Sequence, residues 1–156
     1  MRISDIEKKI NREVIIRQTQ ISTSKPGVLR GIHAEPQDKI ITPMTGLMLA
    51  VFVDLRKNSD TLGHHIAMEF DMKEPEATPY TSVFIPERVG NSFCVHGKKV
   101  VVYQYAVSKE YDPKTAGKGV RWDDPELGIQ WPIENPVISE RDVELPSFSS
   151  YIKNNE

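Results

Sequence analysis

Between Val14 and Ser108 the chain is a series of short segments with strand-like patterns, separated by turns that contain Pro, Gly, Asn or Asp. The eight segments read EVIIRQTQIS, GVLRGIH, KIITPM, LMLAVFVDLR, GHHIAMEFDM, SVFIP, NSFCV and KVVVYQYAVS. Short strands in series, with no long helix between them, are typical of proteins built from β-sheets alone. We therefore predict an all-β fold, a jelly-roll β-barrel or β-sandwich.

Two of these segments have informative burial patterns. Residues 47–53, LMLAVFV, are apolar at every position, which predicts a central strand covered on both faces. Residues 65–72 alternate between apolar and polar, so Ile66, Met68, Phe70 and Met72 are predicted to face one way, and His65, Glu69 and Asp71 the other.

The two ends of the chain depart from this strand pattern. Three isoleucines recur at helical spacing, so a short N-terminal helix is predicted over residues 3–12, and Ser4 with Glu7 fits a capping box. After Ser108 the sequence is irregular and rich in proline. We expect this C-terminal tail to wrap the outside of the barrel rather than to build it.

Length and composition limit the class of protein. The 156 residues fit one domain, residues 1–156, and the net charge of −2 with scattered basic residues argues against a nucleic-acid surface. The longest apolar run, residues 47–53, is too short to cross a bilayer, and the charged N-terminus lacks the apolar stretch of a signal peptide. A single cysteine, Cys94, excludes an internal disulfide. We expect a cytoplasmic protein without nucleic-acid or membrane partners.

The segment GVLRGIH places a charge and a histidine in an apolar strand. Arg30 and His33 are three positions apart, so a regular strand would direct them to opposite faces. A bulge at Gly31 would direct both side chains to the interior. The bulge is the structural consequence expected if His33 does proton chemistry rather than satisfying a hydrogen bond in the core.

Other residues also place a proton carrier or a charge in or beside an apolar run. They are Lys39 in KIITPM, Tyr103 and Tyr105 in VVYQYAV, and Asp142 in ISERD. Each has a purely structural interpretation as well: tyrosines often pack half-buried, a lysine can protect a strand edge, and Asp142 can lie in a polar turn. The residue types alone leave both interpretations open.

The histidines do not form a metal-binding pattern. A metal site needs several His and carboxylate ligands that converge on one ion. His64 and His65 are adjacent, so in a strand they point to opposite faces. We predict no metal site, and surface or packing roles for His64, His65 and His96.

Eight motifs follow one another along the chain: SKPGVLRGIHAE, DKI, VDLR, SDTLG, IPERVGNSF, YQYAVSKEYDP, GVRWDDPELGIQWP and PVISERD. Their order resembles that of the dTDP-4-dehydrorhamnose 3,5-epimerases, which are metal-free cupins of nucleotide-sugar metabolism. The resemblance extends from about Gln18 to Asp142, and LRGIH, RWDDPELGIQWP and ISERD are its most specific parts. It implies a cupin-type jelly roll and an isomerase that acts on nucleotide sugars.

The resemblance also implies roles for individual residues. His33 matches the catalytic base of the family, and Asp142 matches the carboxylate paired with that base. Tyr105 matches the tyrosine proposed as general acid, and Lys39 matches the lysine near the keto group of the sugar.

Four further positions match the substrate site of the family. Arg30 matches an arginine near the phosphates, and Tyr111 matches an aromatic residue near the nucleotide. Gln18 and Asp54 also fall on active-site positions.

These residue types suit the implied chemistry. A C4 ketone makes the protons on C3 and C5 removable, because their loss gives an enolate. A histidine held by an aspartate removes the proton, a lysine stabilises the enolate oxygen, and a tyrosine returns a proton from the opposite face. No metal or redox cofactor is required. The implied partners are a nucleotide-diphosphate sugar, dTDP-linked, and a second copy of the chain in a homodimer.

The sequence departs from the family pattern on the substrate side. Asn91 replaces an active-site histidine, and HAE (residues 33–35) replaces the usual histidine-aromatic-glutamine. The loop between His33 and Lys39 is about four residues shorter than is usual, and the leader before Gln18 is short and helical rather than β-rich. These departures leave open the sugar, the nucleotide, and whether C3, C5 or both are inverted.

Two other functions remain as alternatives. One is a jelly-roll ketoisomerase that moves the carbonyl between C4 and C3, although that class lacks RWDDPELGIQWP and SERD. The other is a sugar-nucleotide-binding protein without activity, for which a base and an acid would be unnecessary. An epimerase is the favoured prediction.

Overall fold

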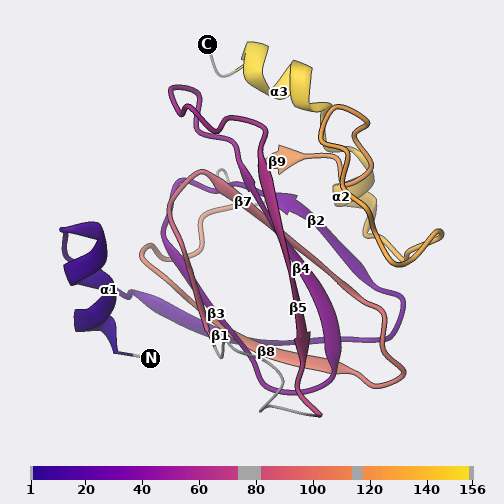
Figure 1. The fold of residues 1–156 in the computed structure, drawn as a ribbon, viewed down its shortest axis with the longest axis horizontal. Helices are drawn as coiled ribbons and strands as arrows, with labels where there is room; N and C mark the ends of the chain where they lie inside the picture. The colour runs from indigo at the N-terminus through magenta and orange to yellow at the C-terminus, as the bar shows by residue number, and fades with distance from the viewer. Residues whose placement is uncertain (1, 74–81, 114–117, 155–156) are drawn as a thin grey trace.

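The computed structural model describes residues 2–73, 82–113 and 118–154. Within these ranges nine strands form two antiparallel sheets that pack face to face (Figure 1). The four-stranded sheet has the order β1 (Gln18–Ser24), β8 (Val101–Val107), β3 (Lys39–Pro43) and β6 (Val83–Ile85). The five-stranded sheet has the order β5 (His65–Asp71), β4 (Leu47–Asp54), β7 (Val89–Val95), β2 (Leu29–His33) and β9 (Gly119–Val120).

The two sheets form a sandwich. Over the described ranges no strand pairing joins one sheet to the other, so the barrel is not closed. The predicted all-β class is confirmed, and all eight predicted segments contain a strand. The ninth strand, β9, comes from the tail that we expected to stay outside.

The space between the sheets is filled by apolar side chains from both. They include residues of β3, β4, β5, β7 and β8: Ile41, Met48, Ala50, Phe52, Phe70, Phe93, Val95, Val101 and Tyr103. Strand β4 contributes every second residue to this core. Val51 and Val53 of the same strand face the other way and are also fully buried. The prediction of a central strand covered on both faces is therefore confirmed.

The C-terminal tail covers the outer face of the five-stranded sheet (Figure 1). It contains α2 (Glu140–Val143) and α3 (Phe148–Asn154). Leu127, Trp131 and Phe148 of this tail pack against the outward side chains of β4 and β2. The predicted wrapping is confirmed. The tail also adds a strand to the five-stranded sheet, because β9 pairs with β2.

The N-terminal helix α1 (Ile3–Ile10) lies beside the sandwich at the β1 end (Figure 1). The predicted helix is confirmed, but its predicted capping box is wrong. The helix begins two residues earlier than that box requires, so Ser4 lies within it, and Glu7 accepts a hydrogen bond from Val14 N at 3.0 Å instead. No helix in the described ranges is long and apolar enough to cross a membrane.

The apolar side chains of the alternating strand β5 are buried at only one end of the strand. Phe70 is fully buried, whereas Ile66 is 65% exposed and Met72 lies beyond the end of the strand. Strand β5 is the edge of its sheet. The predicted common direction is confirmed within the strand, because Ile66, Met68 and Phe70 pair with core residues of β4. Alternation indicates which way a side chain points and not whether another element covers it.

The pairing of β9 with β2 requires a glycine at position 119. A Cβ atom at Gly119 would lie 1.8 Å from the carbonyl oxygen of Ile32, an impossible contact with backbone. Gly119→Ala should therefore lower the free energy of unfolding by about 2 kcal/mol or more, measured by urea denaturation. Lys118→Ala, one residue away and exposed, should leave it nearly unchanged. Equal stability of the two variants would contradict the observed pairing.

Candidate active site

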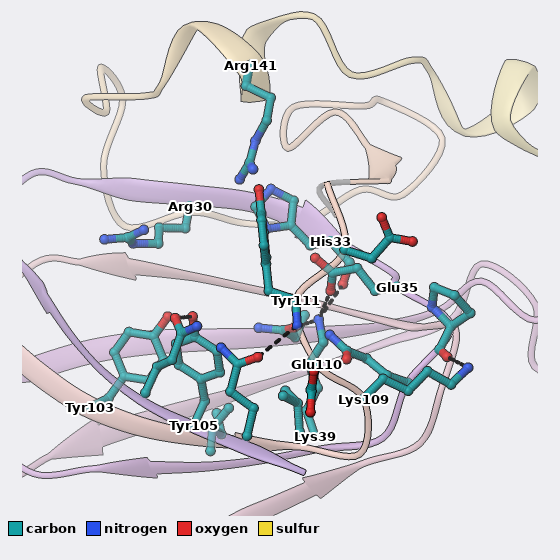
Figure 2. A pocket seen from close by; sticks show the side chains of 18 residues that line it. Arg30, His33, Glu35, Lys39, Tyr103, Tyr105, Lys109, Glu110, Tyr111 and Arg141 are labelled. Atoms are coloured by element: carbon teal, nitrogen blue, oxygen red, sulfur yellow. Dashed lines mark hydrogen bonds and ion pairs between the residues drawn. The ribbon is translucent and has the colours of Figure 1, made fainter. Parts of the chain in front are cut away.

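A cavity of about 300 Å³ opens between the two sheets at one end of the sandwich (Figure 2). We call it the inter-sheet cavity. Its lining comes from β1, β2, β3, β7, β8 and the segment after β8. Seven of the predicted site residues line it: Gln18, Arg30, His33, Lys39, Asn91, Tyr105 and Tyr111.

His33 is hydrogen-bonded to Asp142, which the tail supplies. Its Nε2 lies 2.7 Å from Asp142 Oδ1, and Gly31 N donates to Asp142 Oδ2 at 3.0 Å. Because an ionised carboxylate only accepts hydrogen bonds, Nε2 carries a proton, and whenever the ring is neutral Nδ1 is its unprotonated nitrogen. The structure thus holds His33 in the tautomer of a general base, although the two residues are 109 positions apart.

The local backbone explains how Asp142 approaches so closely. The register between β2 and β7 shifts between Arg30 and His33, which confirms the predicted irregularity around Gly31. Both side chains consequently reach the inter-sheet cavity. A Cβ atom on Gly31 would lie 3.1 Å from Asp142 Cβ, so the glycine also gives the carboxylate its room.

Asp142 is ionised in this setting. Burial alone would raise its pKa, but the hydrogen bonds and charge of His33, with further hydrogen bonds from Gly31 N and Ser139, outweigh burial and hold the pKa well below its ordinary value. Ser139 also caps α2 by accepting from Asp142 N at 3.2 Å. A fixed anion behind His33 is the arrangement that stabilises an imidazolium when the histidine takes a proton.

Tyr105 reaches the cavity from the opposite sheet. Its hydroxyl donates to Gln20 Oε1 on the neighbouring strand β1, and its ring stacks on Tyr103 with centroids 5.8 Å apart. Burial raises the pKa of Tyr105 above its ordinary value of 10; Arg30 opposes this rise and Glu35 adds to it. The phenol is therefore neutral near pH 7 and has a proton to donate.

Lys39 begins β3 and lies deep in the same cavity. Its Nζ donates to Glu35 Oε2, to Asn91 Oδ1 at 2.8 Å and to the His33 carbonyl oxygen at 3.4 Å. A positive charge is thereby held beside the backbone of the candidate base. An ammonium at this place can stabilise an oxyanion that forms next to His33.

Arg30 is available to bind an anion. Its Nε donates to Ser24 Oγ at 3.1 Å, and it forms no ion pair with any carboxylate in the described part of the chain. Arg141 and Lys109 line the same cavity, so three cationic side chains surround it in addition to Lys39 (Figure 2). This charge suits a diphosphate.

Gln18 and Tyr111 lie together at the open side of the cavity. Gln18 Oε1 accepts a hydrogen bond from Tyr111 N at 2.7 Å. The Tyr111 residue is 64% exposed, so its ring can take part in stacking at the cavity mouth.

Asp54 is not brought into the cavity. It ends β4, and its carboxylate accepts hydrogen bonds from Arg56, Ser59 and Thr61 in the following loop. The hydrogen bond from Arg56 is the largest cause of a pKa well below the ordinary value, with burial acting in the opposite direction. Asp54 stabilises this loop and does not line the inter-sheet cavity.

Among the lining residues that sequence reasoning missed as functional candidates are Gln20, Glu35, Lys109 and Arg141. Gln20 shares a strand face with Gln18, which is a signal that could have been used. Arg141 is adjacent to Asp142 and lies 3.6 Å from its carboxylate. Glu35 was noted only as a departure from the family pattern, because its contact with Lys39 depends on how the short loop folds.

The histidines outside the cavity have the predicted structural settings. His96 lies 3.2 Å from Glu69 on the five-stranded sheet, and His64 and His65 are exposed. Across residues 2–73, 82–113 and 118–154, no three His, Cys, Asp or Glu side chains are grouped closely enough to hold a metal ion.

Comparison with known proteins adds to this geometry. The family model described as dTDP-4-dehydrorhamnose 3,5-epimerase matches residues 4–150. The dTDP-4-dehydrorhamnose 3,5-epimerase of Shigella flexneri is 31% identical over 146 residues, which are 91% of this chain and 77% of that protein. The dTDP-4-dehydrorhamnose 3-epimerase of Streptomyces niveus is 36% identical over 137 residues, 85% of this chain and 63% of that one.

The fold is also similar to solved structures. A 4-keto-6-deoxy sugar epimerase from the novobiocin biosynthetic gene cluster of Streptomyces spheroides superposes with a TM-score of 0.88 at 30% identity. The superposition covers 99% of this chain and 76% of that one. Sequence and structure therefore agree on one family.

The lowered pKa of Asp142 has a consequence for stability. Its ionised form stabilises the folded state above the ordinary pKa of 3.8, and this contribution is lost as the pH falls below that value. Asp142→Asn lacks the contribution at every pH. The free energy of unfolding should therefore differ most between wild type and Asp142→Asn at neutral pH, and the difference should narrow below about pH 4, measured by urea denaturation.

A second carboxylate serves as the control for this experiment. Glu134 is an exposed residue of the same tail, so Glu134→Gln should follow the wild-type curve at all pH values. A difference for Asp142→Asn that stays constant from pH 7 to the acid region would contradict the assignment.

Proposed function

The chain belongs to the dTDP-4-dehydrorhamnose 3,5-epimerase family, and we propose that it inverts C3, C5 or both in a dTDP-linked 4-keto-6-deoxy sugar. The observation that carries this proposal is the pairing of His33 with Asp142 on one side of the cavity and Tyr105 on the other. A base and an acid on opposite sides of a bound ring are what an inversion requires. The protein is an isomerase.

The proposed reaction begins at His33. Its Nδ1 removes the proton on C3 or C5, and Asp142 stabilises the imidazolium that results. The electron pair moves into the C4 carbonyl, and the enolate oxygen is stabilised by the Lys39 ammonium. Tyr105 then donates its proton to the opposite face of the carbon. The sugar leaves with only its configuration changed, and water then takes the proton from His33 and returns one to Tyr105, which restores both residues.

The remaining lining residues are proposed to hold the nucleotide diphosphate. Arg30, which forms no ion pair in the described ranges, binds the phosphates, and Tyr111 stacks on the base. Gln18 and Asn91 supply polar contacts from β1 and β7. Asp54 is left out of this set, because its carboxylate lies in a loop away from the cavity.

Deuterium incorporation tests the chemistry directly. Wild-type protein in D₂O should place deuterium at C3, C5 or both of a 4-keto nucleotide sugar, detected by NMR. His33→Asn should reduce incorporation by a factor on the order of 100 or more, because the base is lost. Tyr105→Phe should impair net inversion more than proton removal.

The control for these variants is Gln104→Ala. Gln104 is an exposed neighbour of Tyr105 on β8, and successive strand residues face opposite sides, so its loss should not change the rate. Absence of deuterium from every 4-keto sugar tested would refute the epimerase proposal, and normal incorporation by His33→Asn would refute the role of His33.

We also propose that the protein is a homodimer that associates through the outer face of the four-stranded sheet. Strand β1 is an edge of that sheet, and its Ile21 is 68% exposed on the outer face. A large apolar side chain exposed on an edge strand favours contact with a second chain.

The homodimer proposal has a matched pair of variants. Ile66 is 65% exposed on β5, at the edge of the other sheet. Ile21→Lys should shift the protein toward a monomer in light-scattering measurements, whereas Ile66→Lys should not. A dimer that survives Ile21→Lys at low protein concentration would contradict the proposed interface.

A further inference from the structure

The ammonium of Lys39 is enclosed by acceptors of this chain. Its three contacts are the Glu35 carboxylate, the Asn91 amide oxygen at 2.8 Å and the His33 carbonyl oxygen at 3.4 Å. The side chains of Lys39 and Glu35 are only 9% and 14% exposed. An ammonium has three N–H groups, so these contacts use all of them.

The three contacts are unequal in strength. The bond to Glu35 joins opposite charges, and such bonds are roughly twice as strong as neutral ones. The bond to Asn91 is of ordinary length, while the bond to the His33 carbonyl, at 3.4 Å, is the longest. A substrate oxygen therefore most easily replaces the His33 carbonyl oxygen as the acceptor of a Lys39 N–H.

Glu35 is itself held in place by the backbone of its loop. Its carbonyl oxygen accepts hydrogen bonds from Gln37 N at 2.8 Å and Arg88 N at 3.1 Å. The following residue, Pro36, has its carbonyl oxygen bound by Lys109. These hydrogen bonds fix the backbone of residues 35 and 36, and so fix the place from which the Glu35 carboxylate contacts Lys39.

The two side chains that hold Lys39 are Glu35 and Asn91, at positions where the resemblance implies a glutamine and a histidine. An ionised carboxylate and an amide oxygen only accept hydrogen bonds, so both suit a donor-only ammonium. Both Glu35 and Asn91 therefore accept a hydrogen bond from the same atom, Lys39 Nζ.

We propose that Glu35 is a positioning residue for Lys39. Together with Asn91 it fixes the ammonium so that the N–H now directed at the His33 carbonyl is the one offered to the keto oxygen of the substrate. The base and the stabilising charge then act on adjacent atoms of the sugar. This inference rests on the proposed epimerase function, because it assigns Glu35 a part in that reaction.

A double-mutant cycle tests whether Glu35 acts through Lys39. Glu35→Gln keeps the size and one acceptor oxygen but loses the charge, so kcat for deuterium exchange should fall about tenfold, as a charge-assisted bond becomes neutral. KM should stay within about twofold, because substrate binding is not altered. In a Lys39→Met background, Glu35→Gln should cause no further loss.

Two outcomes of the cycle would overturn the proposal. One is an equal loss of kcat in the two backgrounds, and the other is no loss in the wild-type background. Glu35→Asp, which keeps the charge, should retain more activity than Glu35→Gln. Glu134→Gln removes an exposed carboxylate of the tail that does not line the cavity, and it should leave kcat unchanged.

A measurement without substrate separates this proposal from the proposed function. The Nζ protons of Lys39 should exchange slowly with water in the wild-type protein, observed by ¹⁵N NMR, because all three are bound. Glu35→Gln should accelerate this exchange about tenfold or more, at an unchanged melting temperature. Equal exchange in both proteins would refute the positioning role. A lack of deuterium in every sugar, with protected Lys39 protons, would refute only the epimerase proposal.

Discussion

The contact of Asp142 with β2 is the interaction on which the candidate site depends. One carboxylate binds His33 at 2.7 Å and the backbone of Gly31 at 3.0 Å, and it thereby joins the C-terminal tail to the irregular strand that also carries Arg30. The tail could not reach this point without the layer of apolar side chains that attaches it to the outer face of the five-stranded sheet. Hydrophobic packing places the tail, and hydrogen bonding then sets the tautomer of the base.

The two sheets of the sandwich supply different residues of the candidate site. The five-stranded sheet supplies His33 and Asn91, while the four-stranded sheet supplies Tyr105 and Lys39. The apolar core beneath keeps the two sheets at a constant spacing. A base and an acid can therefore face each other across the cavity without either strand having to move.

Much of this was predictable from local patterns. The irregularity around Gly31 followed from the parity of Arg30 and His33, and the covered strand β4 followed from its uninterrupted apolar run. Local patterns did not show how exposed a side chain is, which groups it binds, or where the first helix begins. Ile66 has the predicted direction, yet its position on an edge strand leaves it 65% exposed. Asp54 is bound by its own loop, and the helix with Ser4 begins two residues too early for the proposed cap.

The sequence by itself determined the class of fold from its strand pattern. It indicated the candidate base His33, its partner Asp142 and the candidate acid Tyr105 through a resemblance rather than through spacing. Residue spacing cannot show that Glu35 reaches Lys39, because the contact depends on the path of a short loop tied to Arg88 and Lys109. Only the tertiary structure decided which acceptors surround that ammonium. Strand periodicity sets the direction of a side chain, whereas long-range packing sets what it meets there.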